Sequence, residues 1–290
     1  MSDIKIDKNM ISSAHINFLF GAGVNGKAFP QLSGFVKTIG ILEEKLGRKV
    51  KSFEDDLNTL TKEDDKEEVY KEFGNEFKEF EKNINLESDS LINLQKLLKS
   101  IYKVVEESEN RQRDMKQINI YTLNYDDILE SILNKVGFMN NNVSATNLGE
   151  NIKFLDLVAY DYTTYKYIPT FMISKLHGDI NKPIYPGINK YETSLASEYF
   201  EINFRMKEQL SKDNSILIVI GYSCQDEHIN KILQDCIKHG LVIYWFKYQK
   251  NDKVLQNCPE KQLIIFDQPD ESHKIDTTEI CSHYLEECYE

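Results

Sequence analysis

Six short apolar runs recur along the 290-residue chain, and each is bounded by polar or glycine-containing segments. The runs are Ile16–Phe20, Ile118–Leu123, Phe171–Leu176, Ile216–Ile220, Leu241–Phe246 and Leu263–Phe266. Runs of this length, without polar alternation, are typical of strands that are buried on both faces of a parallel sheet. Helical patterns separate several of them, notably at Asp126–Lys135 and Asp226–Lys238. The alternation predicts an α/β fold with a mostly parallel sheet and helices on both of its faces.

The stretch between the first two predicted strands has a different composition. Residues 51–90 contain 14 acidic and six basic residues, so they carry eight of the chain's twelve net negative charges. Apolar residues there fall three and four positions apart, which indicates amphipathic helices. They are Phe53, Leu57, Leu60, Tyr70, Phe73, Phe77 and Phe80. We expect residues 1–290 to form one Rossmann-like domain in which residues 45–110 are a helical insertion, a charged cap without chemistry of its own.

Charge and composition exclude several classes of protein. A net charge of −12 and a pI near 5.1 argue against direct binding to nucleic acid or to an anionic membrane. The longest aliphatic run, Ile216–Ile220, is too short to span a bilayer, and the first residues do not resemble a signal peptide. Five scattered cysteines without a Cys-x-x-Cys pair fit reduced thiols better than disulfides or a four-cysteine zinc site. We therefore expect a cytoplasmic protein without a metal centre.

Polar or glycine-containing segments follow four of the predicted strands. They are Gly21–Gly26 (GAGVNG), Asn124–Asp127 (NYDD), His177–Asp179 (HGD) and Gly221–Asp226 (GYSCQD). In open α/β sheets, ligands bind beyond the carboxyl ends of the strands. We therefore expect the four segments to meet around one site.

The first of these segments has the spacing of a phosphate-binding turn. Gly21, Gly23 and Gly26 follow the G-x-G-x-x-G pattern, in which backbone amides can approach a pyrophosphate at a helix N-terminus. A dehydrogenase would also need an acidic residue about 20 positions later, at the end of the second strand. That region, Gly40–Val50, has a helical pattern instead. Hydride transfer is therefore disfavoured, and an ordinary strand-to-helix turn remains an alternative.

Each of the other segments has a chemical and a structural interpretation. Asn124 can both donate to and accept from a ribose hydroxyl or a water, whereas Asp126 equally suits a helix N-cap. His177 can serve as a general base near neutral pH, although a single histidine is more often structural. Ser223 can bind a phosphate or a ribose, and Asp226 can cap the helix that follows.

Together the four segments resemble the motifs of the sirtuin (SIR2-like) family, which has a GAG turn, T-x-N-x-D, a catalytic HG and a glycine–serine turn. The matching residues are Gly21-Ala22-Gly23, Thr122-Leu123-Asn124-Tyr125-Asp126, His177-Gly178 and Gly221-Tyr222-Ser223. The resemblance implies that Asn124 and Asp126 line a nicotinamide–ribose pocket and that His177 is the catalytic base. It also implies which residues hold the phosphates and ribose of NAD: Gly21, Ala22, Gly23, Gly221 and Ser223.

The chain also departs from the protein deacylases of that family. The deacylases carry a four-cysteine zinc module after the HG, and this sequence has none. Leu123 replaces their Gln, and Ala28–Leu32 (AFPQL) replaces their Pro-Asp-Phe-Arg stretch. The chain looks more like the SIR2-like effectors of bacterial anti-phage systems, which hydrolyse NAD. That resemblance implies NAD as the substrate, no zinc, a homo-oligomer and, as in some short members, a HerA-type ATPase partner.

The sequence thus leads to the hypothesis of an NAD⁺ hydrolase (NADase) with Asn124, Asp126 and His177 as catalytic residues. It would release nicotinamide and ADP-ribose and would serve antiviral defence by depleting NAD. Two alternatives stay open. An NAD-dependent protein deacylase or ADP-ribosyltransferase would use the same pocket and would require an acyl peptide or another acceptor. A non-catalytic sensor would bind NAD or ADP-ribose tightly without turnover.

Overall fold

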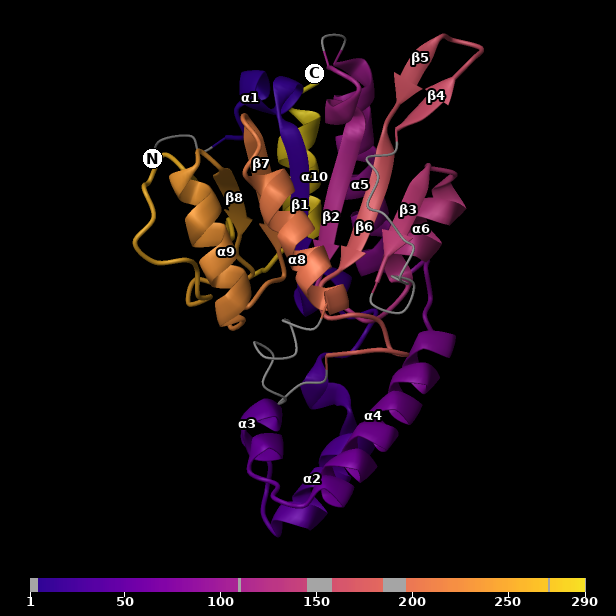
Figure 1. The fold of residues 1–290 in the computed structure, drawn as a ribbon, viewed down its shortest axis with the longest axis vertical. Helices are drawn as coiled ribbons and strands as arrows, with labels where there is room; N and C mark the ends of the chain where they lie inside the picture. The colour runs from indigo at the N-terminus through magenta and orange to yellow at the C-terminus, as the bar shows by residue number, and fades with distance from the viewer. Residues whose placement is uncertain (1–4, 109–110, 145–157, 185–196, 271, 290) are drawn as a thin grey trace.

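The computed structural model describes residues 5–108, 111–144, 158–184, 197–270 and 272–289. Within them lies a seven-stranded sheet in which all neighbouring strands are parallel, in the order β3-β6-β2-β1-β7-β8-β9 (Figure 1). The strands are β1 (His15–Phe20), β2 (Gln117–Thr122), β3 (Asn140–Val143), β6 (Thr170–Lys175), β7 (Ser215–Ile220), β8 (Val242–Phe246) and β9 (Leu263–Phe266). All six predicted strands are present to within one residue at each end, and the predicted α/β fold is confirmed.

Helices cover both faces of the sheet, as predicted. They are α1 (Lys8–Ser13), α5 (Asp89–Glu107), α6 (Ile128–Val136), α8 (Ser197–Leu210), α9 (Glu227–Lys238) and α10 (Thr277–Glu286). Figure 1 shows α8 and α9 in front of the sheet and α5 and α10 behind it. Alternate residues of each central strand enter the two cores: Phe18 of β1 packs behind the sheet, and Leu19 packs in front. Burial of both faces explains why these strands read as unbroken apolar runs.

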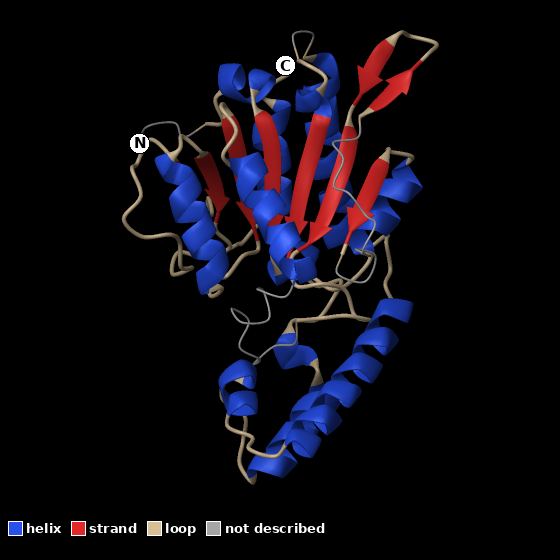
Figure 2. Cartoon of the chain, in the orientation of Figure 1, coloured by secondary structure: helices blue, strands red, loops and turns tan. Residues whose placement is uncertain are grey.

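A lobe of three helices lies beyond the carboxyl ends of the strands, toward which the arrows in Figure 2 point. We call α2 (Val36–Leu46), α3 (Phe53–Asn58) and α4 (Glu63–Lys82) the helical lobe. It has a small core of its own, and the Glu76 carboxylate of α4 accepts hydrogen bonds from two amides at the start of α2. The following helix, α5, returns to the sheet. The assignment of residues 45–110 to one helical insertion stays a prediction, and its last two residues lie outside the described ranges.

Some elements had no recognisable pattern in the sequence. Strand β3 is the run Asn-Asn-Asn-Val at the edge of the sheet, where it pairs with β6. The antiparallel hairpin of β4 (Ala159–Asp161) and β5 (Lys166–Ile168) projects beyond the opposite end of the sheet (Figure 1). Short 3₁₀ turns, η1 (Ala22–Asn25), η2 (Leu32–Gly34) and η3 (Asp114–Lys116), complete the described elements. No helix in the described ranges is long and apolar enough to cross a bilayer.

The strand order reverses between β1 and β7. From β1 the chain enters β2 on one side, and it later returns to place β7 on the other side of β1. At such a reversal the connections leave in opposite directions, so a crevice opens at the carboxyl ends of the two strands. The segments that begin at Gly21 and Gly221 follow these two strands.

Candidate functional site

A cavity of about 450 Å³ lies at these strand ends, a volume within the range of small-molecule sites. All eight residues that the resemblance assigns to the NAD site line it: Gly21, Ala22, Gly23, Asn124, Asp126, His177, Gly221 and Ser223. The structure therefore brings together segments that lie far apart in the chain. The individual roles assigned to these residues stay predictions.

The glycines of the two turns pack backbone against backbone. A Cβ atom on Gly21 would lie 2.3 Å from the Gly221 oxygen, and one on Gly221, where φ is +68°, would lie 2.4 Å from the Val24 nitrogen. The Gly21 and Gly23 amides already donate to the carbonyls of Ile220 and Gly221. The close contact of the turns thus explains the glycines, and a bound phosphate would need other donors, such as the exposed hydroxyl of Ser223.

Asn124 connects the segment after β2 to the turn after β1. Its side-chain Nδ2 donates to the Gly21 oxygen at 3.4 Å, and its backbone amide donates to Oγ1 of Thr122 at 3.1 Å. The residue is 8% exposed and lines the cavity. The residue is therefore held at the cavity wall by contacts with the turn after β1 and with the last residue of β2.

Asp126 is a buried carboxyl group on the wall of the cavity. Its Oδ2 accepts from Nδ2 of Asn25 at 2.8 Å, and its Oδ1 accepts from the Ile128 amide at 3.2 Å. Burial raises the pKa of Asp126 to about 6, although these two hydrogen bonds and the charge of Lys175 act to lower it. Asp127, not Asp126, occupies the N-cap position of α6, so the N-cap role considered for Asp126 is wrong; Asp126 instead accepts from the amide of Ile128, the first residue of that helix.

Sequence reasoning missed Asn25, which lies inside the GAGVNG segment. The residue is 2% exposed, lines the cavity and hydrogen-bonds Asp126. Its Oδ1 is buried and has no hydrogen-bond partner within the described part of the chain. A polar side chain within a glycine turn was the available signal. Asn25 and Asp126 together present an amide and a carboxyl group to one end of the cavity.

His177 lies beside a carboxylate from a distant segment. Its Nε2 is 3.5 Å from Oδ1 of Asp226, and the two side chains are 6% and 8% exposed. Asp226 occupies the N-cap position of α9, as considered from the sequence, but its side chain makes no capping hydrogen bond there. The ring of His228 lies 5.9 Å from that of His177. The imidazole of His177 is therefore set between the cavity and an acidic group.

Aromatic side chains form another wall of the cavity. Phe29 and Phe35 come from the loop after η1, and Phe73 and Phe77 come from α4 of the helical lobe. The ring centroids of Phe29 and Phe77 are 5.0 Å apart, and those of Phe35 and Phe73 are 4.9 Å apart. The insertion thus contributes an apolar surface of α4 to the cavity, and the expectation that it has no chemistry of its own stays a prediction.

The cysteines are free thiols, and Cys236, Cys281 and Cys288 are buried. Among the residues with described positions, no group of three or more His, Cys, Asp or Glu side chains is arranged to hold a metal ion. Burial raises the pKa of Cys224, the cysteine in the turn after β7. We therefore assign no thiolate chemistry to that turn.

Comparison with known families identifies the middle of the chain. The sequence model of a family described as a SIR2-like domain matches residues 118–264, about half of the chain. No curated protein matches the chain. The matched range runs from β2 into β9 and includes Asn124, Asp126, His177 and Ser223. The GAG turn precedes this range, and the structure connects it through β1, which lies between β2 and β7.

Proposed function

Because the chain belongs to the SIR2-like domain family, whose domains use NAD, we propose that it hydrolyses NAD⁺ to nicotinamide and ADP-ribose. The observation that carries this proposal is the convergence of Asn124, Asp126 and His177 on one cavity at the reversal of strand order. The cavity combines an aromatic wall with amide, carboxyl and imidazole groups. Such a combination suits a ligand with a flat ring attached to a polar sugar.

The reaction breaks the bond between the nicotinamide nitrogen and the ribose carbon. The nicotinamide of NAD⁺ is cationic and leaves as a neutral molecule, so the enzyme need not protonate it, while positive charge builds on the ribose. A water oxygen then forms the new bond to that carbon and loses a proton. The task of the protein is therefore to place the ribose and the water and to accept that proton.

Each polar group of the cavity has a place in this reaction. Asp126 and Asn25 hold the carboxamide of nicotinamide, which offers both donors and an acceptor. Asn124 orients the ribose or the water. His177 accepts the proton, and the neighbouring carboxylate of Asp226 orients the ring and stabilises its charged form. The hydroxyl of Ser223 and the Ala22 part of the GAG turn bind the phosphates.

The proposal extends to the cellular role. Depletion of NAD by this activity would serve defence against phage in the cytoplasm, and uncontrolled hydrolysis would harm the cell that makes the enzyme. Activation by self-association or by a HerA-type ATPase would prevent this harm. The resemblance to anti-phage effectors supports both a homo-oligomer and such an ATPase partner. Native mass spectrometry of the purified chain, alone and with a co-encoded ATPase, tests the assembly.

Chromatography of NAD⁺ incubated with the purified protein tests the activity, with and without that ATPase and without added peptide. We expect nicotinamide and ADP-ribose from the wild type and loss of turnover in His177→Ala and Asn124→Ala. The matched control is His283→Ala, which removes an exposed imidazole on α10. Full activity in both site variants would refute the assignment, and tight NAD binding without turnover in the assembled complex would favour a sensor.

A further inference from the structure

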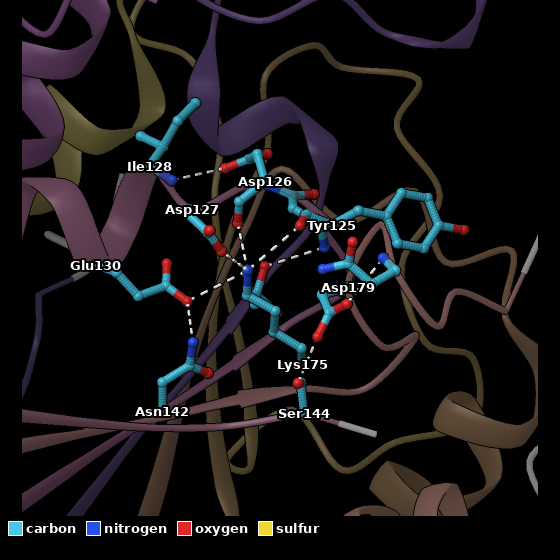
Figure 3. Close-up of polar contacts among 12 residues, drawn as sticks. Tyr125, Asp126, Asp127, Ile128, Glu130, Asn142, Ser144, Lys175 and Asp179 are labelled. Atoms are coloured by element: carbon cyan, nitrogen blue, oxygen red, sulfur yellow. Dashed lines mark hydrogen bonds and ion pairs between the residues drawn. The ribbon is translucent and has the colours of Figure 1, made fainter. Parts of the chain in front are cut away.

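A fully buried lysine lies directly beneath the segment that carries Asn124 and Asp126. Lys175 is the last residue of β6 and is 1% exposed. Figure 3 shows its ammonium group at the centre of a polar cluster. Nζ donates to the backbone oxygens of Asp126 at 2.7 Å and Tyr125 at 3.3 Å. Two of the three residues that follow Asn124 are thus held through their peptide groups.

Carboxylates complete the environment of this ammonium group. Nζ forms ion pairs with Asp127 and, at 3.2 Å, with Oε1 of Glu130, and Glu130 also accepts from Nδ2 of Asn142 at 2.6 Å. Burial opposes the charged form, but the two carboxylates outweigh it and raise the pKa of Lys175 above its ordinary value. A buried lysine is rare unless it is paired. Lys175 is therefore a charged, fully engaged group that does not line the cavity.

The position of Lys175 in the sheet connects the two halves of the site. It is paired in register with Thr122 of β2, and His177 follows it by two residues. The Leu176 amide, between Lys175 and His177, donates to the Thr122 oxygen at 2.9 Å. Lys175 thus connects the segment after β2, which carries the amide and carboxyl groups, to the end of β6, from which the chain continues to His177.

We propose that Lys175 is a positioning residue that holds the Tyr125 and Asp126 peptide groups so that Asn124 and Asp126 face the cavity beside His177. This inference rests on the proposed hydrolysis for its effect on turnover. Lys175 would act through these other residues, because it does not line the cavity in which the substrate would bind. The positive charge also lies close enough to Asp126 to favour its ionised form against the effect of burial.

The chain offers a matched control for the purely structural alternative. Lys116 is a second buried lysine, 9% exposed, and its Nζ donates to the backbone oxygens of Val105 at 2.8 Å and Glu106 at 3.1 Å. It lies at the amino end of β2, the end of the sheet away from the cavity. If Lys175 only stabilised the fold, Lys175→Met and Lys116→Met would affect the protein in the same way.

The first experiment measures kcat and KM for NAD⁺ in both variants at a temperature where each remains folded. We expect Lys175→Met to lower kcat about 100-fold, because small displacements of catalytic groups have effects of that size, with less than a threefold change in KM. Lys116→Met should keep kcat within twofold of the wild type. Equal values of kcat in the two variants, or an unchanged kcat in Lys175→Met, would overturn the proposal.

The second experiment does not depend on turnover. Hydrogen exchange is measured by mass spectrometry over residues 121–130, where the Leu123 and Ile128 amides are hydrogen-bonded. We expect faster exchange in Lys175→Met and wild-type exchange in Lys116→Met. This result with a wild type that binds NAD⁺ without turnover even in the assembled complex would refute the proposed hydrolysis and retain the positioning role. Unchanged exchange in Lys175→Met would refute the positioning role even if the wild type hydrolyses NAD⁺.

Discussion

Nε2 of His177 lies 3.5 Å from Oδ1 of Asp226, although the two residues follow strands that are separated by two others in the sheet. A carboxylate beside an imidazole can select its tautomer, fix the ring plane and stabilise the charged form. In the proposed hydrolysis, the pairing would orient His177 as the base.

Asp226→Asn tests this relationship. The substitution keeps the shape of the side chain and removes its charge, so we expect kcat for NAD⁺ hydrolysis to fall about 10- to 100-fold while KM changes little. Steady-state kinetics measure the effect, and Glu227→Gln, at an exposed neighbouring position, is the control. An unchanged kcat in Asp226→Asn would show that the carboxylate does not act on His177.

Asp126→Asn should change how stability depends on pH. Burial raises the pKa of Asp126 from 3.8 to about 6, so the folded protein holds this proton more tightly than the unfolded chain. The stability that the proton contributes is fully present below pH 3.8 and is lost as the pH rises through 6. Relative to wild type, the variant's free energy of unfolding should therefore increase by roughly 1.4 kcal/mol from pH 5 to pH 8.

Urea titrations at several pH values measure this difference. Asp235→Asn is the control, because hydrogen bonds from Lys238 and Lys207 lower the pKa of that exposed carboxyl group and keep it ionised over the same range. The difference in unfolding free energy between Asp235→Asn and wild type should stay constant between pH 5 and pH 8. A constant difference for Asp126→Asn as well would mean that Asp126 is not a carboxyl group with a raised pKa.

Gly221→Ala tests the contact between the two turns. Gly221 has a φ of +68°, and an added Cβ would lie 2.4 Å from the Val24 nitrogen; Gly137 has a φ of +76° and open space around it. Gly137→Ala should cost about 1 to 2 kcal/mol, the backbone penalty alone. Gly221→Ala should cost at least about 2 kcal/mol more, because the turns must separate. Similar losses of unfolding free energy in Gly221→Ala and Gly137→Ala, measured by denaturant titration, would show that the two turns can separate without loss of stability.

Asn25→Ala tests the partner of Asp126. In the proposed reaction Asn25 and Asp126 together hold the carboxamide of NAD⁺, so we expect kcat/KM for NAD⁺ to fall about 10- to 100-fold, which corresponds to about 1.5 to 3 kcal/mol. Asn119→Ala is the control, because it removes a buried amide that bonds Asn17 in the interior of the sheet. The control should lose stability and keep kcat/KM. Equal kinetic effects in the two variants would exclude a specific role for Asn25.

The fold was largely predictable from the chain's own pattern. A parallel strand that is buried on both faces must be apolar throughout, so β1, β2 and β7 are visible as short apolar runs. The polar segments after them were recognisable for the same reason, since they interrupt those runs at the strand ends. Strand β3 was not predictable, because the run Asn-Asn-Asn-Val at the edge of the sheet is neither an apolar run nor the polar end of one.

The sequence alone was enough to identify the polar segments that meet at the cavity, because the glycine turns, the T-x-N-x-D segment and the HG are each local patterns; it did not identify Asn25 or the aromatic wall. The side chains and carbonyls that these residues contact could be identified only from the folded chain. The contacts between His177 and Asp226, between Asp126 and Asn25, and between Lys175 and the Tyr125 and Asp126 carbonyls join segments that are distant in sequence. Such contacts leave no local periodicity, because strand order and the return of α4 over the strand ends determine which side chains meet.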